Sequence, residues 1–216
     1  MDLLDPQPGE DILDVGAGQG VLAPYVAKRG ARYTGLDASP RLIELARRRH
    51  APSGRFVVGD ARALNAVPRL RAQSFDAAVF LLSIQDMDPL GPIFASLDWE
   101  LRARSRVVLL MTHPAFRQPR HAGWGFDPSC KVVYRRVDAY LGEMAVPMKA
   151  IGDRRTVAFH RPISTYVNGL AAVGFAVDAM VELPDLPDVL RPPGRRPAGR
   201  AGEDIPLFLG LRARRP

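Results

Sequence analysis

The chain has 216 residues, of which 47% are hydrophobic, so we expect one domain with a substantial core. Its single cysteine, Cys130, excludes an intrachain disulfide framework. The sequence has neither a secretion-signal pattern nor an apolar run of about 18 residues, so secretion and membrane spanning are not expected. The formal net charge of +7 comes mainly from arginine, and we expect a cytoplasmic protein with solvated basic charge.

The first predicted element is a short buried strand over residues 12–15, and it ends in three glycines spaced by two, Gly16, Gly18 and Gly20. Glycines let the backbone turn tightly and approach a ligand where a Cβ would collide. Helical apolar spacing follows over residues 21–28. A strand, a glycine turn and a helix N-terminus in this order are typical of an α/β sheet that binds a nucleoside-bearing cofactor.

The glycine spacing distinguishes between cofactors. A dinucleotide loop places its third glycine one residue later than this chain does. The pattern Asp14-x-Gly16-x-Gly18-x-Gly20 resembles motif I of the class I S-adenosylmethionine (SAM)-dependent methyltransferases. That resemblance implies that the loop, including Ala17, cradles an amino acid and a ribose rather than a phosphate. An ordinary glycine-rich turn is the alternative.

Two further acids follow predicted strands. Residues 33–37 form a strand that ends in Asp37, whose carboxylate, with Ala38 beside it, can accept hydrogen bonds from both ribose hydroxyls. Residues 56–60 form a strand that ends in Asp60. The resemblance implies that Asp60 accepts from the adenine amino group and that the Ala61 amide meets a ring nitrogen. Each acid could instead cap the next helix.

The later elements complete an alternating pattern. Strands are expected over residues 75–82 and 106–113, with a closing antiparallel pair over 175–181 and 205–211, and helices over 41–49, 92–101 and 163–173. The resemblance implies that Leu82 and Ser83 contact the cofactor and that Gln85 faces the acceptor. We therefore predict an α/β fold: a Rossmann-like, seven-stranded, mostly parallel sheet with helices on both faces and an antiparallel last strand.

A long, aromatic-rich connection separates the fifth strand from the next helix. We interpret residues 1–216 as a single domain in which residues 113–162 form a substrate lid, with a short helix near 132–141. His113 and, more weakly, His160 are candidate bases, and each could instead only fix the backbone. Trp124 and Tyr134 could wall an aromatic or apolar acceptor or pack the lid onto the core, and Arg135 could hold an acceptor carboxylate, although exposed charge is favoured.

Stretches of this connection, 113–125, 134–140 and 159–162, are similar to a small-molecule subgroup of the methyltransferase type 11 group. The resemblance implies transfer of the SAM methyl group to an O, N or C atom of a small-molecule acceptor, with S-adenosylhomocysteine (SAH) as product. One alternative is an RNA or DNA methyltransferase. It is possible but not favoured, because residues 83–86 lack the Asn/Asp-Pro-Pro-aromatic pattern of base-amino methylation. Another alternative is a SAM-binding protein without methyl transfer.

Three further points concern metals, charge and assembly. No pair of histidines has the tight spacing of a metal-ligand set, so no metal is expected. The arginine-rich loop at 191–200 could contact phosphates, but solvated charge is favoured. The acceptor and the oligomeric state stay open.

Overall fold

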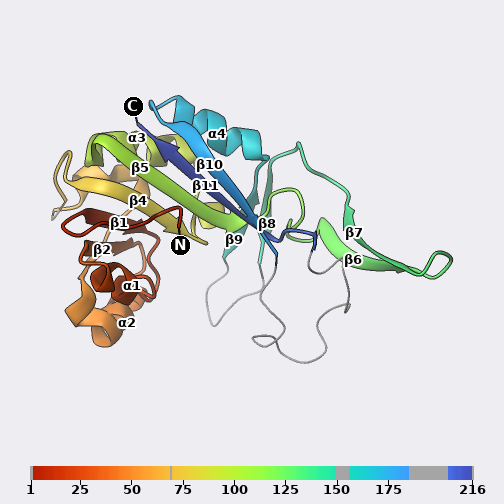
Figure 1. The fold of residues 1–216 in the computed structure, drawn as a ribbon, viewed down its shortest axis with the longest axis horizontal. Coiled ribbons are helices and arrows are strands. Elements are labelled where there is room, and N and C mark those ends of the chain that lie inside the picture. Colours follow the sequence, from red (N-terminus) through yellow and green to blue (C-terminus); the bar gives the residue numbers. More distant parts are fainter. Residues whose placement is uncertain (1, 69, 149–155, 185–203, 216) are drawn as a thin grey trace.

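A seven-stranded sheet forms the centre of the computed structural model, which describes residues 2–68, 70–148, 156–184 and 204–215 (Figure 1). The strand order is β10-β11-β5-β4-β1-β2-β3. The strands of this sheet are β1 (Asp11–Val15), β2 (Arg32–Asp37), β3 (Arg55–Val58), β4 (Phe75–Leu81), β5 (Leu101–Thr112), β10 (Ala176–Leu183) and β11 (Phe208–Arg214). The predicted arginine-rich loop at 191–200 lies outside the described residues.

The sheet is parallel except for one strand. β1 pairs in parallel with β2 and β4, and the parallel pairs β2–β3 and β4–β5 extend the sheet on either side. β11 is antiparallel to both β5 and β10, so β10 runs in the same direction as the parallel strands. The predicted fold class, including the antiparallel last strand, is confirmed.

Helices cover both faces because neighbouring residues of one strand point to opposite sides. Leu13 of β1 packs with the helices α3 (Leu90–Glu100) and α4 (Ile163–Ala171), whereas Ile12 packs with α1 (Ala23–Lys28) and α2 (Pro40–His50). The described residues also form the short 3₁₀ helices η1 (Ala51–Ser53), η2 (Ala61–Ala66) and η3 (Ile84–Asp86). Within the described ranges, no helix has the length and apolar character needed to cross a membrane.

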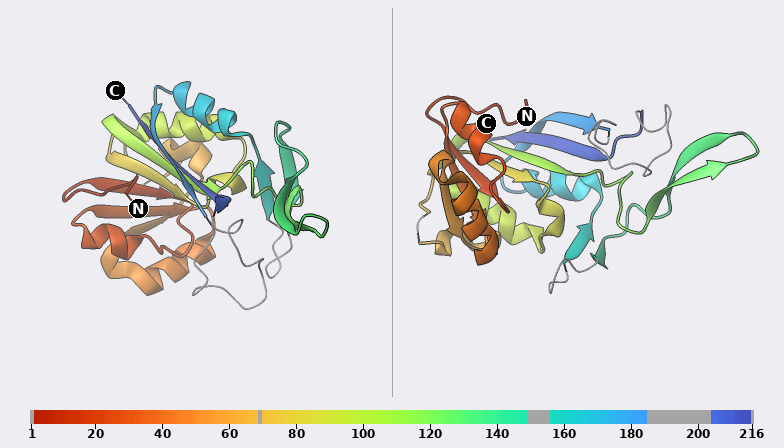
Figure 2. Two further views of the ribbon diagram at one scale, coloured as in Figure 1. Left: turned by 45° about the vertical axis from the view of Figure 1, so that its right-hand side comes forward. Right: turned by 90° about the horizontal axis from the view of Figure 1, so that it is seen from below.

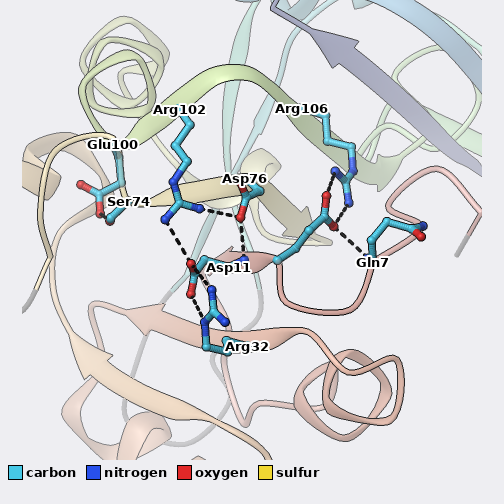
Figure 3. Close-up of polar contacts among 9 residues, drawn as sticks. Gln7, Asp11, Arg32, Ser74, Asp76, Glu100, Arg102 and Arg106 are labelled. Atoms are coloured by element: carbon cyan, nitrogen blue, oxygen red, sulfur yellow. Dashed lines mark hydrogen bonds and ion pairs between the residues drawn. The ribbon is translucent and has the colours of Figure 1, made fainter.

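An ion-pair network ties together the amino ends of the central strands (Figure 3). The Arg32 guanidinium donates twice to the Asp11 carboxylate, at 2.7 Å each, and Arg102 reaches both Asp11 and Asp76. The Arg32 hydrogen bonds are the largest reason why the pKa of Asp11 lies below its usual value. This network fixes one edge of the sheet, and the opposite edge, at the carboxyl ends, is where α/β sheets bind ligands.

Two small antiparallel sheets occupy the predicted lid region. They are β6 (Ala122–Asp127) with β7 (Val132–Val137), and β8 (Met144–Pro147) with β9 (Val157–His160). The β6–β7 hairpin extends away from the central sheet (Figures 1 and 2). The predicted helix at 132–141 is wrong: its first part is β7, because the valines and Tyr134 favour an extended chain and pair across to β6.

Candidate cofactor-binding site

A cleft of about 430 Å³ lies at the carboxyl ends of β1 to β4. It is bounded by the turns that follow these strands and by the start of α3. Its lining consists of Gly16, Gly18, Leu36, Asp37, Ala38, Leu42, Gly59, Asp60, Ala61, Arg62, Leu82, Ser83, Asp86, Met87, Asp88 and Ile93. A volume in this range suits a small ligand or a cofactor.

The glycine loop after β1 needs its glycines for two different reasons. Gly16, Gly18 and Gly20 all have positive φ, at +75°, +55° and +74°. A Cβ on Gly16 would lie 2.6 Å from the Ser83 Cβ, and one on Gly20 would lie 2.5 Å from the Phe56 ring. A Cβ on Gly18 would meet nothing within 4 Å. The absence of a side chain at Gly18 therefore keeps the cleft open, whereas Gly16 and Gly20 allow the loop to pack against Ser83 and Phe56.

The amide groups of this loop are already used inside the protein. Gly16 and Ala17 both donate to the Leu36 carbonyl, at 2.8 and 2.9 Å, and Gly18 donates to the Asp37 carboxylate at 2.9 Å. Loops that hold a phosphate instead direct their free amides at its oxygens. These three amides are therefore not available to a pyrophosphate.

Asp37, at the end of β2, connects the glycine loop to the residue that precedes α2. Its Oδ2 accepts from the Gly18 amide, and its Oδ1 accepts from the Ser39 amide at 2.8 Å. Each carboxylate oxygen has a second lone pair. The same carboxylate can therefore position the glycine loop and still accept hydrogen bonds from a ligand's hydroxyls.

Asp60, after β3, acts as a cap and also lines the cleft. It accepts from the Arg62 amide at 2.9 Å at the start of η2, and the Arg62 guanidinium pairs with it at 2.7 Å. The hydrogen bonds from the Arg62 side chain hold the pKa of Asp60 below its usual range. Asp60 therefore caps η2, as the alternative prediction states, and it also lines the cleft.

The cleft is acidic although the whole chain is basic. Asp37, Asp60, Asp86 and Asp88 line it; Asp60 is paired with Arg62 and Asp88 with Arg161, so among the described residues only Asp37 and Asp86 lack an ion-pair partner. Burial raises the pKa of Asp86 above its usual value. The local field therefore favours a cationic ligand and opposes a phosphate.

Asp14 lies beneath the glycine loop rather than in the cleft lining. It is only 1% exposed, its Oδ2 accepts from the Tyr33 hydroxyl at 2.7 Å, and its Oδ1 has no partner among the described residues. Burial raises the pKa of Asp14 to about 7. Asp14 therefore supports the loop from below as a carboxyl that is largely protonated under mildly acidic conditions.

The raised pKa of Asp14 predicts a pH-dependent stability. The folded state retains a proton that the unfolded state has already lost above its ordinary pKa, so the free energy of unfolding should fall from pH 5 to about pH 7.5 and then level off. Urea unfolding across this range should show a fall on the order of 3 kcal/mol that Asp14→Asn reduces. Burial also raises the pKa of Glu100 to about 7, so Glu100 should contribute a further fall in the free energy of unfolding over this pH range. Glu100→Gln should remove this further fall. An Asp14→Asn profile parallel to that of the parent would contradict this assignment.

Most of the residues predicted to bind the cofactor line one cleft, and the cleft lining also includes residues that were not predicted. Gly16, Gly18, Asp37, Ala38, Asp60, Ala61, Leu82 and Ser83 line the cleft, whereas Asp14, Ala17 and Gly20 are not in its lining. Asp86, Met87 and Asp88 were missed although they directly follow the predicted strand-end segment. Arg62 was missed because only the folded chain shows its pairing with Asp60.

The two candidate bases lie outside the cleft lining. His113 is 1% exposed: its Nδ1 accepts from the Ala115 amide, so Nε2 carries the proton and faces Glu182 Oε1 at 2.9 Å. His160 Nε2 donates to the Tyr140 carbonyl at 2.7 Å. This geometry does not favour His113 as a base, and the base assignments stay predictions. In the described parts of the chain, no cluster of His, Cys, Asp and Glu is arranged to hold a metal ion.

The predicted acceptor residues divide into two places. Trp124, Tyr134 and Arg135 lie on the β6–β7 hairpin, where Arg135 stacks on Trp124 at 5.1 Å and Tyr134 packs on Gly125. Gln85 lies in η3, between residues that line the cleft, and its Nε2 donates to the Leu82 carbonyl at 2.7 Å. The structure therefore brings Gln85, but not the hairpin residues, to the edge of the cleft.

Comparison with known proteins agrees with this geometry. Residues 12–97 match the family described as "Methyltransferase domain". The demethylmenaquinone methyltransferase of Tropheryma whipplei is 32% identical over 113 residues, which are 52% of this chain and 46% of that protein. The chain thus spans about half the length of the curated relatives it matches.

Solved structures resemble the chain over nearly its whole length. A SAM-dependent methyltransferase from Mesorhizobium loti has a TM-score of 0.78 and 27% identity, covering 99% of this chain and 94% of that one. The glycopeptide N-methyltransferase MtfA, solved with SAM, has a TM-score of 0.61 and 18% identity, covering 96% and 88%. The strand order and the strand-end cleft define a Rossmann-like α/β protein with a nucleoside-type site. More specifically, the fold is similar to that of solved SAM-dependent methyltransferases, and residues 12–97 match a methyltransferase domain.

Proposed function

We propose that this protein transfers the methyl group of SAM to a small-molecule acceptor and releases SAH. The observation that carries the proposal is the combination of an acidic cleft with a glycine loop whose amides are committed to the protein. SAM bears a positive sulfonium and no phosphate, so this cleft suits it better than it suits a dinucleotide. The relatives named above, which are methyltransferases, support the same reading.

The proposed cofactor contacts follow from the lining. Asp37 would accept from the ribose hydroxyls, Asp60 and the Ala61 amide would bind the adenine edge, and Gly16 and Gly18 would allow close approach of the ligand. When bound, SAM supplies a methyl group on a positively charged sulfur, which an acceptor's lone pair takes by in-line displacement as the carbon–sulfur bond breaks.

The remaining lining would shape the reaction. Ser83 is held rigidly, because its Oγ donates to the Val15 carbonyl at 2.6 Å, and Met87 lies against Gly16. This fixed wall would align the acceptor and exclude water. The acceptor's proton leaves to a base or to solvent, and His113 and His160 stay only candidates for that role.

The acceptor is proposed to be a small molecule. The relatives are named for demethylmenaquinone, for O-methylation in ubiquinone biosynthesis and for N-methylation of a glycopeptide. An acidic cleft opposes entry of a phosphate backbone, so RNA or DNA stays the less favoured acceptor. A cytoplasmic location and the single-domain organisation of residues 1–216 belong to the same proposal.

The segment 113–162 is proposed to act as a lid over the acceptor side. β9 packs against η3, and Arg161, directly after β9, pairs with Asp88 of the cleft lining. Addition of SAH should therefore slow amide hydrogen exchange in β9 and in the residues before β6, while β11 serves as an internal reference. Unchanged exchange throughout this segment would show a static wall instead of a lid.

The proposed function is tested with SAM that carries an isotopic label in its methyl group. The purified protein is incubated with this SAM and with separated pools of small metabolites, RNA and DNA, and we expect label only in the metabolite pool. At a SAM concentration near the parent's Kd, Asp37→Ala should strongly reduce the labelling, whereas Asp178→Ala, which removes an acid paired with Arg212 and Arg214 at the sheet edge, should not. SAM binding without labelling of any pool would identify a SAM-binding protein that does not transfer methyl groups, and preference for NAD over SAM would overturn the proposal.

A further inference from the structure

A second, much smaller cavity of about 20 Å³ lies beside the cofactor cleft. It has room for about one water-sized group, so only one oxygen at the end of a larger ligand fits inside it. Its lining comes from η3, the end of β5, the segment after it, β9 and α4, and includes Gln85, Arg117, Phe159, His160, Arg161 and Tyr166. None of the hydrogen bonds that build the cofactor loop involves these side chains.

Two arginines bring unused hydrogen-bond donors to this cavity. Arg161 is 4% exposed; one of its guanidinium nitrogens pairs with Asp88, but its Nη1 is buried without a partner among the described residues. Arg117 has a buried Nη1 that likewise lacks one. Buried charged donors are costly to leave unpaired, so such groups mark a place where a ligand or a water binds.

The Arg161 side chain also forms a hydrogen bond with the neutral Tyr166 hydroxyl, and the other contacts of the two arginines are with aromatic rings. The Arg117 guanidinium carbon lies 4.6 Å from the centre of the Phe208 ring, and that of Arg161 lies 5.1 Å from the centre of the Phe159 ring. Each aromatic face fixes the plane of its guanidinium. In the described chain no carboxylate forms an ion pair with Arg117, so the cavity carries positive charge beyond what Asp88 neutralises.

The cavity shares a wall with the cofactor cleft. Asp88 lines the cleft and holds Arg161, and Gln85 lines the cavity while it donates to the carbonyl of Leu82, another cleft residue. Gln85 Oε1 is also buried without a partner and can accept a hydrogen bond. The arrangement thus offers two guanidinium donors and, in the lining of the same cavity, an acceptor of hydrogen bonds.

We propose that Arg117 and Arg161 bind a carboxylate group of the methyl acceptor, so that the acceptor is an organic acid. Two guanidinium groups match the charge and the oxygens of a carboxylate. Gln85 Oε1 then accepts from a hydroxyl or amino group of the same molecule. This inference rests on the proposed function, because it names the acceptor class of that site.

Formate, the smallest carboxylate, is the probe for this site. With SAH present, formate is titrated into ¹⁵N-labelled protein at constant ionic strength, and the Nε–Hε signals of the arginines are followed by NMR. Arg117→Lys and Arg161→Lys assign the two signals. We expect saturable shifts for Arg117 and Arg161 and none for Arg120, an exposed neighbour whose guanidinium donates to the Pro147 carbonyl.

Variants measure the strength of the site. Arg117→Gln should raise the formate Kd about tenfold, as expected for loss of a charged hydrogen bond, and Arg120→Gln should leave it unchanged. Unchanged SAH affinity in Arg117→Gln shows that the variant is folded. Linear, equal shifts of all arginines would mean an adventitious ion only and would overturn the proposal, as would equally tight binding of chloride.

The labelled-methyl assay separates this inference from the proposed function. If the labelled metabolites are organic acids and Arg117→Gln raises their KM with little change in kcat, the inference is supported. If the labelled metabolites are uncharged and Arg117→Gln leaves their KM unchanged, the inference fails while the proposed function stands. Saturable formate binding without any methyl transfer would refute the proposed function, and with it the acceptor class, and would leave only an anion site.

Discussion

Replacing Asp37 by alanine should weaken the binding of SAM and SAH by at least tenfold. The substitution removes the acceptor proposed for the ribose hydroxyls, and unpaired polar groups in a binding site cost about 1.5–3 kcal/mol. It also removes the carboxylate that holds the Gly18 and Ser39 amides. Both effects act in the same direction, so titration calorimetry should show a large loss.

Two comparisons make this result interpretable. Asp178→Ala removes one negative charge from the edge strand β10 and should leave SAH affinity unchanged, so a loss in Asp37→Ala cannot come from net charge. Thermal unfolding of Asp37→Ala without ligand reports how much the loop contributes to stability by itself. An affinity equal to that of the parent would remove Asp37 from the binding site.

Local signals were sufficient to predict the central sheet. The apolar runs of β1 and β4 are buried on both faces, and each ends in a polar or glycine turn, so the strands and their parallel order follow from short stretches. The glycine loop and the acids Asp37 and Asp60 follow directly after strands. Parallel strands bring their carboxyl ends to one edge, and the predicted residues therefore meet.

Contacts between distant segments explain what the sequence could not predict. The pair Asp88–Arg161 joins residues 73 positions apart, and nothing in either local pattern indicates it. Asp14 matches a binding motif, yet its place below the loop depends on the Tyr33 hydroxyl 19 residues later. The hairpin residues Trp124 and Arg135 pack on each other across two strands, which composition alone does not distinguish from a place in the cleft.

Gly16→Ala should cause a large loss of stability and should also abolish SAH binding. The new Cβ would lie 2.6 Å from the Ser83 Cβ and 2.7 Å from the Met87 Cε, at a residue with φ of +75°. Overpacking and a left-handed backbone together cost about 2–5 kcal/mol. Urea unfolding should show this fall, and binding of SAH should be lost because Ser83 and Met87 belong to the cleft wall.

Gly18→Ala separates ligand contact from backbone strain. Gly18 has φ of +55° and Gly174, remote from the cleft lining, has φ of +82°, and a Cβ on either would meet nothing within 4 Å. Both alanine variants should therefore lose a similar stability of about 1–2 kcal/mol. Only Gly18→Ala places a methyl group at the cleft, so only this variant should bind SAH at least tenfold more weakly in calorimetry. Equal SAH affinity in the two variants would show that Gly18 is needed for the turn alone and that the cofactor does not approach this glycine closely.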